Sequence, residues 1–410
     1  MTTDHDAIVV GARCAGAPTA MLLARRGMRV LLVDRSTFPS DTVSTLVIHP
    51  TGLAALRRWG LFDELVATGC RPMGTYSFDF GPVVIAGRPR SVDGIAAALA
   101  PRRTVLDKLL VDAAAASGVE VREGFTVEDI LVEDGAVVGI RGHADGGSTV
   151  QERARVVIGA DGHNSRVARA VGAEQYNELP VLENAFYTFW RDLPVDAFTT
   201  MLRGDRGVVA VPTNDELTLV LVGCPAAQAP DFKHDVVGSY FEAVDRVPAF
   251  AERLRAAERV DRFRVGGVPN FFRKPYGPGW ALVGDAGYTK DPVTAQGISD
   301  AFRGAEQCTA AIARAFDGDA TWDTAMGDYQ QARDEQAMPI YRFTTELARL
   351  EPPPPDVQQL LGAVATDQHA MDDFVSVTAG SLSPAAFFDP DNVGRIMGAA
   401  APALRPVGAR

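Results

Sequence analysis

The chain has 410 residues, of which 47% are hydrophobic and 22% charged, an ordinary balance for a globular protein long enough to form two domains. Its formal net charge of −12 at pH 7 disfavours nucleic acids and anionic membranes as partners. No apolar run is long enough to span a bilayer and no secretion signal opens the sequence, so we expect a cytoplasmic protein. The four cysteines are scattered without metal-ligand spacing, so no metal site is expected.

The N-terminal segment predicts a nucleotide-binding βαβ unit. Residues 7–10 form a short apolar strand, residues 17–26 contain helix formers, and MRVLLVDR predicts a second buried strand that ends in an acid. Gly11 permits a tight turn and Gly16 permits close packing of the helix on the strand, while the helix N-terminus attracts phosphate. Asp34 follows at close to the ~20-residue spacing typical of an acid that binds a ribose hydroxyl.

One residue departs from this pattern. Arg13 stands where the dinucleotide fingerprint G-x-G-x-x-G has its middle glycine, which normally lets the backbone approach the pyrophosphate. Its side chain could turn away from the turn, or it could place the guanidinium near the phosphates. The alternative to the whole motif is a structural turn that binds nothing.

Two later strands also end in aspartates. RARVVIGADGHNSR delivers Asp161 and GWALVGDAGY delivers Asp285, each at the carboxyl end of an apolar strand, where open parallel sheets bind their ligands. Asp285 could accept a hydrogen bond from a sugar hydroxyl, and the N–H groups of residues 295–298 could stabilise negative charge at the start of a long helix. For Asp161 alone, a helix-capping role is an equal alternative.

Together with RRTVLDKLLVDAA, these motifs resemble the flavin monooxygenases of the para-hydroxybenzoate hydroxylase type, in a superfamily shared with geranylgeranyl reductases and flavin-dependent halogenases. The match spans roughly residues 8–316. The resemblance implies a bound FAD and a Rossmann-like α/β FAD-binding domain. The expected FAD contacts are Gly11, Arg13, Cys14, Ala15, Gly16, Asp34, Arg35, Arg103, Val127, Asp161, Gly284, Asp285, Pro292, Gln296, Gly297 and Ile298.

Two insertions predict a second domain. Residues 73–97 and 178–269 contain period-two patterning typical of an antiparallel or mixed sheet. We therefore expect an inserted substrate domain, followed by C-terminal helices. The expected boundaries are 1–72, 98–177 and 270–345 for the FAD-binding domain, 73–97 and 178–269 for the substrate domain, and 346–410 for the C-terminal helical segment.

Aromatic side chains of the inserted strands are candidates for a substrate pocket at the junction of the two domains. Phe78, Tyr187, Trp190 and Phe271 are the expected substrate-lining residues, with ordinary core packing as the more frequent alternative. Only one face of each strand can look into a cavity, which limits the set.

The resemblance implies a monooxygenase that uses NAD(P)H as a transient reductant and O2 to hydroxylate an aromatic or other electron-rich small molecule through a C4a-(hydro)peroxyflavin. No second glycine-rich fingerprint is visible, so NAD(P)H would bind without its own domain, or a partner flavin reductase would supply reduced flavin. His49 and Tyr288 are the candidate proton-handling residues. For His49, a hydrogen bond to the backbone is the more frequent alternative.

Some features differ from the family pattern. Tyr288 stands in GDAGY where these monooxygenases usually have a histidine, and DPVTAQGISDAF is closer to the reductase-like and halogenase-like branches. The Pro-Cys-Gly-Gly type loop of the reductases and the tryptophan-containing strand motifs of tryptophan halogenases and prenyl reductases are absent. A flavin-dependent reductase, a halogenase with a partner reductase, and a flavoprotein that only binds a ligand are therefore the alternatives.

Overall fold

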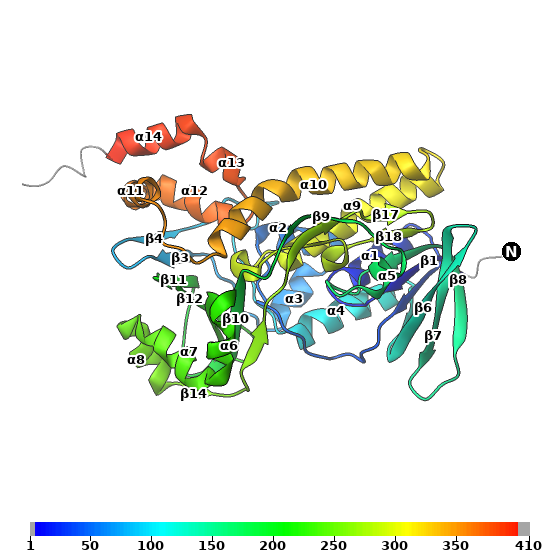
Figure 1. Cartoon of the computed structure of the whole chain (residues 1–410), viewed down its shortest axis with the longest axis horizontal. Coiled ribbons are helices and arrows are strands. Elements are labelled where there is room, and N and C mark those ends of the chain that lie inside the picture. Colours follow the sequence, from blue (N-terminus) through cyan, green and yellow to red (C-terminus); the bar gives the residue numbers. More distant parts are fainter. Residues whose placement is uncertain (1–4, 401–410) are drawn as a thin grey trace, which may run out of the picture.

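The computed structural model describes residues 5–400, and the predicted helical residues 401–410 lie outside this range (Figure 1). Five parallel strands, in the order β18, β8, β1, β2, β5, form the centre of an eight-stranded sheet. They are Trp280–Leu282, Val150–Gly159, His5–Val10, Val30–Val33 and Glu120–Arg122, and β17 (Tyr276–Gly277) pairs with β18 at the edge. Apolar, mostly β-branched residues dominate the central strands because both faces of the sheet are covered.

Side-chain alternation along β1 sends Val9 to one face of this sheet and Ile8 to the other. Helices cover the Val9 face, and the antiparallel strands β6 (Phe125–Glu133) and β7 (Ala136–Ala144) pack on the Ile8 face together with α5 (Arg166–Ala170). The helices on the Val9 face are α1 (Gly16–Ala24), α2 (Pro50–Trp59), α3 (Phe62–Ala67), α4 (Arg103–Ala116), α9 (Gly297–Phe316) and α10 (Trp322–Leu347).

A second eight-stranded sheet joins the two predicted insertions. Its order is β14, β10, β13, β12, β11, β3, β4, with β15 beside β10, and all pairs are antiparallel except β11 with β3. The strands are β3 (Tyr76–Asp79), β4 (Val84–Gly87), β10 (Glu183–Arg191), β11 (Phe198–Arg203), β12 (Arg206–Pro212), β13 (Thr218–Pro225), β14 (Glu258–Arg259) and β15 (Arg264–Gly266).

Helices enclose this second sheet from both sides (Figure 1). Phe186 and Trp190 of β10 pack under α6 (Ala229–His234), α7 (Val236–Asp245) and α8 (Pro248–Ala256). The opposite face, including Ala185 and Tyr187, belongs to the core that holds the C-terminal helices. These helices are α11 (Pro355–Val364), α12 (Gln368–Thr378), α13 (Pro384–Phe387) and α14 (Pro390–Ala400).

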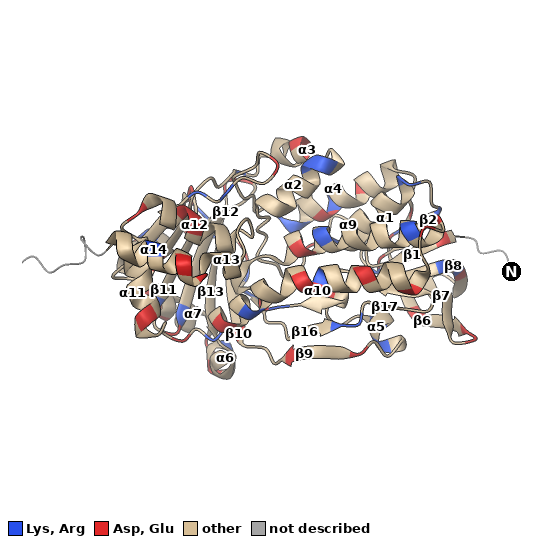
Figure 2. Cartoon of the chain, turned by 90° about the horizontal axis from the view of Figure 1, so that it is seen from above, with Lys and Arg blue, Asp and Glu red and all other residues tan. Residues whose placement is uncertain are grey.

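The first sheet with its helices forms one lobe, and the second sheet with its helices forms the other. A three-stranded sheet of β9 (Gln175–Leu179), β16 (Asn270–Arg273) and β19 (Tyr288–Thr289) lies where the chain passes between these lobes. The long helix α10 carries both basic and acidic residues and runs along the first lobe toward the second (Figure 2). Between residues 5 and 400, no helix has the length and apolarity needed for a membrane crossing. The architecture confirms the predicted fold class: a Rossmann-like domain, an inserted mixed-sheet domain and C-terminal helices.

Candidate active site

The ends of four parallel strands meet at one edge of the first sheet. Val10 lies opposite both Val33 and Gly159, and Gly159 lies opposite Leu282, so the four strands finish at the same level. The turns that follow carry Gly11, Asp34, Asp161 and Asp285. Segments far apart in the sequence are therefore brought together at the edge where parallel sheets bind ligands.

The first turn is too tight for any side chain larger than hydrogen at its two predicted glycines. Gly11 has φ +102°, and a Cβ there would lie 2.5 Å from the carbonyl oxygen of Ala160. A Cβ on Gly16 would lie 1.7 Å from the carbonyl oxygen of Gly11. The Asp34 carboxylate supports the turn by accepting a 2.7 Å hydrogen bond from the backbone N–H of Ala12. Helix α1 begins at this edge with its positive dipole end.

Arg13 is held by a residue that the sequence analysis missed. Its guanidinium donates to the carboxylate of Asp107 and, over 2.8 Å, to the hydroxyl of Ser40. Asp107 is fully buried and also accepts hydrogen bonds from Arg103, at 3.0 and 2.9 Å. One buried carboxylate thus fixes both arginines beside the turn. The i,i+4 spacing of Arg103 and Asp107 on α4 was the available signal.

The thiol of Cys14 belongs to the same cluster, 3.4 Å from Asp107 Oδ1. Burial raises its pKa far above the ordinary value, so this thiol stays protonated. All four cysteines are free and buried.

The carboxylate of Asp161 is occupied by hydrogen bonds from residues that follow it closely in the sequence. It accepts hydrogen bonds from the Ser165 hydroxyl, the Arg166 N–H at 2.6 Å and the Val167 N–H at 3.3 Å, and so caps the short helix α5. The geometry favours the helix-capping alternative for its side chain, while its backbone still lies at the shared edge.

Asp285 has a different environment. It is exposed to solvent and lines the same cavity as Tyr288 and Lys290. Desolvation by the surrounding protein raises the pKa of its carboxyl, and the positive charges of Lys290 and Arg103 oppose that rise. A Cβ on the preceding Gly284 would lie 2.6 Å from Cβ of Ala15, so this loop packs directly against the first turn.

Two expected contacts flank Asp34. Arg35 follows it and is exposed, and Val127 is buried in β6. The N–H of Phe125 donates to the carbonyl oxygen of Asp34 over 2.8 Å, which brings the start of β6 alongside the acidic end of β2.

The segment before α9 (residues 291–296) lies between α9 and the second sheet. Pro292 begins a 3-10 turn, Ala295 has φ +53°, and Gln296 precedes the helix. The Gln296 amide donates to the carbonyl oxygen of Thr378 over 2.8 Å, which ties this segment to α12. Ile298 is buried. A Cβ added at Gly297 would meet nothing within 4 Å, so open space lies beside the first turn of the helix, where Gly297 lines a cavity.

His49 is fully buried and both ring nitrogens are engaged. Nδ1 lies 2.8 Å from the Tyr76 hydroxyl and Nε2 lies 3.0 Å from the carbonyl oxygen of Thr294. A carbonyl only accepts, so Nε2 carries the proton and Nδ1 accepts from Tyr76. Burial lowers the pKa of His49 to about 4. The ring is therefore neutral near pH 7 and links the segment before α9 to β3.

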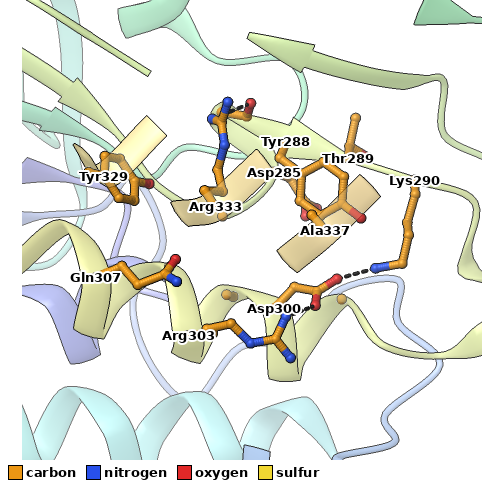
Figure 3. A pocket seen from close by; sticks show the side chains of 15 residues that line it. Asp285, Tyr288, Thr289, Lys290, Asp300, Arg303, Gln307, Tyr329, Arg333 and Ala337 are labelled. Carbon is orange, nitrogen blue, oxygen red and sulfur yellow. Dashed lines mark hydrogen bonds and ion pairs between the residues drawn. The ribbon is translucent and has the colours of Figure 1, made fainter. Parts of the chain in front are cut away.

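Tyr288 lies in a cavity between α9 and α10 whose lining includes several charged side chains (Figure 3). Its hydroxyl is buried and finds no hydrogen-bond partner within the described residues. Lys290 pairs with Asp300 in the same cavity, and Arg333 donates to the carbonyl oxygen of Gly287 over 3.1 Å. Burial raises the pKa of the Tyr288 hydroxyl well above its ordinary value, which favours the protonated form.

A second cavity lies between the second sheet and the segment before α9. Most of its walls are apolar, and no Lys, Arg or His lines it; the lining residues are Thr45, Val47, Glu183, Ala185, Phe198, Thr200, Leu202, Gly207, Val209, Leu219, Leu221, Pro292, Val293, Ala295 and Leu350. Domain junctions of this kind are a common place for small-molecule sites.

The four predicted aromatic residues lie in different places. Tyr187 is on the same face of β10 as the cavity residue Ala185, and its hydroxyl accepts from the N–H of Ser44 over 3.1 Å. Phe78 packs on the cavity residue Phe198. Trp190 points to the opposite face, where its Nε1 donates to the Tyr240 hydroxyl, and Phe271 lies in β16 under the guanidinium of Arg273. Glu183, which no sequence signal marked, lines the cavity instead.

A family model described as "FAD binding domain" matches residues 4–344. Among curated relatives, a 1H-pyrrole-2-carbonyl-[peptidyl-carrier protein] brominase of Pseudoalteromonas luteoviolacea is 25% identical over 83% of this chain and 85% of its own. A digeranylgeranylglycerophospholipid reductase of Methanocella arvoryzae is 28% identical, over 73% and 75%. A 6-methylpretetramide 4-monooxygenase of Streptomyces rimosus is 28% identical, over 73% of each.

Solved structures share the fold. The myxobacterial chondrochloren halogenase CndH superposes with a TM-score of 0.78 at 23% identity and covers 98% of each chain. PqsL of Pseudomonas aeruginosa, described as a probable FAD-dependent monooxygenase, gives a TM-score of 0.69 at 20% identity, over 91% of this chain and 99% of its own. At such identities the superpositions establish the fold alone.

Proposed function

Because the chain belongs to the FAD-binding-domain family and is a flavin-dependent oxidoreductase, we propose that it is a monooxygenase that hydroxylates an aromatic or other electron-rich small molecule with NAD(P)H and O2. The family identifies FAD as the cofactor. The relatives include a monooxygenase, a halogenase and a reductase, so the type of reaction is what we propose. A partner flavin reductase is the alternative source of electrons.

The residues at the edge of the first sheet fit FAD. A side chain at Gly11 or Gly16 would clash with backbone, so the backbone and the start of α1 come close to this edge, as a pyrophosphate requires. We assign the pyrophosphate to this turn and to Arg103. Each carboxylate oxygen of Asp34 accepts one backbone hydrogen bond, Oδ2 from the N–H of Ala12 and Oδ1 from the N–H of Ser36, which leaves lone pairs for ribose hydroxyls.

The remaining cofactor contacts are assigned to the loops beside this turn. Asp285 is an exposed carboxylate in the loop that packs against the turn, suited to accept from a sugar hydroxyl. The start of α9, from Gln296 to Ile298, offers N–H groups and a positive dipole end to a flavin ring. When bound, FAD supplies electron transfer and oxygen activation, while the protein binds, orients and excludes water.

The observation that carries the monooxygenase proposal is the apolar cavity beside the segment before α9. Leu202, Val209 and Leu221 on strands of the second sheet form its walls, together with Val293. Such walls exclude water from a reactive site and accept an apolar substrate. The cavity holds no cation for an anionic substrate, which favours an uncharged one.

A halogenase is the second candidate. It is favoured by the brominase relative, whose match takes in 83% of this chain, and by the DPVTAQG segment. A halogenase requires chloride or bromide for turnover, whereas a monooxygenase does not.

The test uses protein reconstituted with FAD. Flavin reduction by NADH and by NADPH is followed without oxygen, with and without a panel of phenols, and product is then formed under labelled O2 with and without bromide. Faster reduction with a phenol and one labelled oxygen in the product support the proposal. A bromide requirement identifies a halogenase, and an unlabelled product with a saturated double bond identifies a reductase.

A further inference from the structure

Two buried carboxyl groups meet at the wall of the apolar cavity. Glu183 begins β10 and is 3% exposed, and Asp291 precedes Pro292 in the segment before α9 and is 1% exposed. The backbone N–H of Glu183 donates to the Asp291 carboxylate over 3.2 Å, which brings the two acids together. They come from opposite lobes, so the pair exists only where the second sheet meets the segment that faces the flavin region.

The hydrogen bonds indicate where the proton resides. Asp291 accepts from the N–H of Glu183 at 3.2 Å and from the N–H of Val293 at 3.1 Å, and such donors stabilise a carboxylate. Oε2 of Glu183 is buried and receives no donor from the described residues. A carboxylate in that position would be unsatisfied, whereas a carboxylic acid can donate to Asp291. Glu183 therefore keeps the proton, and Asp291 carries the charge.

The chain makes specific room for this arrangement. A Cβ on Gly223, in the neighbouring strand β13, would lie 1.8 Å from Oε1 of Glu183. The glycine thus leaves the carboxyl group space beside the cavity, which Glu183 itself lines. No lysine or arginine is among the groups that shift the pKa of either carboxyl. The nearby Lys290 is paired with Asp300. Glu183 helps to raise the pKa of the Cys224 thiol on β13, after burial as the main cause.

We propose that Glu183 and Asp291 form a proton-accepting carboxyl pair that binds the hydroxyl group of an uncharged, largely apolar substrate in this cavity. The inference rests on the proposed function, since the substrate of the flavin reaction is taken to occupy the cavity. The substrate O–H bond breaks as its proton passes to the free oxygen of Glu183, and the proton already on Glu183 passes to Asp291. No electrons are transferred, and the negative charge moves from Asp291 to the substrate oxygen.

This step would serve hydroxylation because an aromatic ring with an ionised oxygen is richer in electrons. Burial raises the pKa of Asp291 to about 7 and that of Glu183 well above its ordinary value, so the pair changes charge close to neutral pH, where a general base works best. Burying two acids beside an apolar cavity costs folding free energy, and a role in binding substrate explains why the chain carries them there.

The probes are 4-methylphenol and 4-methylanisole, which share an apolar body but differ in the hydroxyl hydrogen. Their binding to oxidised FAD-loaded protein is measured by calorimetry from pH 5.5 to 8.5 without reductant. We expect the phenol to bind at least about tenfold tighter at pH 8, with a preference that declines as Asp291 is protonated, and the anisole to bind independently of pH. 4-Hydroxybenzoate, which adds a charge, should bind at least about tenfold more weakly than 4-methylphenol.

Three variants separate this role from a structural one. Glu183→Gln keeps the shape and the hydrogen bond to Asp291 but cannot relay a proton, so it should retain phenol binding and lose about 100-fold in the rate of hydroxylation. Asp291→Asn should flatten the pH dependence of the phenol preference, and Gly223→Ala should reduce the preference by displacing the carboxyl. Glu258→Gln, at an exposed position of the same sheet, is the matched control.

FAD content and the melting temperature of each variant show whether it is folded. Equal binding of phenol and anisole to the folded wild-type protein overturns the inference, as does a pH dependence that persists in Asp291→Asn. These binding measurements need no turnover. Absence of oxygenated product with the expected preference intact would therefore reject the monooxygenase and leave the carboxyl pair standing.

Discussion

At the scale of single residues, His49 shows how burial converts a candidate base into a positioning group. Its two hydrogen bonds hold Thr294 against Tyr76, and Thr294 belongs to the segment that leads into α9. With a pKa of about 4, the imidazole binds no proton near pH 7. A catalytic role for His49 stays a prediction, and the geometry favours the backbone-bonded alternative.

His49 should make the protein sensitive to acid. Unfolded His49 takes up a proton near its ordinary pKa of 6.5, whereas the folded protein resists protonation down to about 4. The free energy of unfolding therefore falls as pH drops from 6.5 to 4, by roughly 3 kcal/mol from this residue. His49→Gln should lower stability at pH 7.5 but remove most of that slope, as urea unfolding at several pH values with saturating FAD would show. His369→Gln, an exposed histidine, should keep the wild-type slope.

At the scale of elements, the start of α9 is the part of the proposed FAD site that a substitution can probe without breaking the turn. Changes at Gly11 or Gly16 would clash with backbone and disturb the fold itself. Gly297 and Gly362 are both helical, and a Cβ at either meets nothing within 4 Å. They form a matched pair that differs in location.

Gly297→Leu should therefore lower FAD affinity at least about tenfold, because its side chain would enter the space assigned to the flavin ring. Gly362→Leu, in α11, should bind FAD normally. Flavin fluorescence measures the affinity, and the melting temperature of each apoprotein reports on folding. Normal FAD affinity in Gly297→Leu would contradict the assignment of α9 to the flavin.

How far the sequence predicts each element follows from the range of the interactions involved. The βαβ unit and the acidic strand ends could be predicted because strand, turn and helix are encoded by neighbouring residues. The link between Arg13 and Asp107 and the Glu183–Asp291 pair could not, since their partners come from distant segments that only the fold brings together. The alternation of side chains along β10 predicts which residues share a face, but it does not predict which face meets the cavity. Trp190 lies on the face that points away from the cavity.

At the scale of the whole molecule, the C-terminal helices are part of the second lobe. Side chains of α11 to α14 share one core with strands β3, β10 and β13 and with Ala295 before α9. Gln296 adds a hydrogen bond from the α9 start to Thr378 at the end of α12. The helices thus brace the segment that we assign to the flavin, so their loss should disturb the whole lobe.

Adjacent phenylalanines test this view. Phe387 is fully buried and packs on Phe374, whereas Phe388 is 38% exposed. Phe387→Ala should cost about 3–5 kcal/mol of unfolding free energy, and Phe388→Ala about 1 or less. All four tryptophans lie before residue 323, outside these helices, so their fluorescence reports on the rest of the chain. If the C-terminal helices are integral, the fluorescence midpoint in urea falls in Phe387→Ala together with the helical circular dichroism signal. A fluorescence midpoint that stays at the wild-type value while helicity is lost would show instead that α11 to α14 unfold independently.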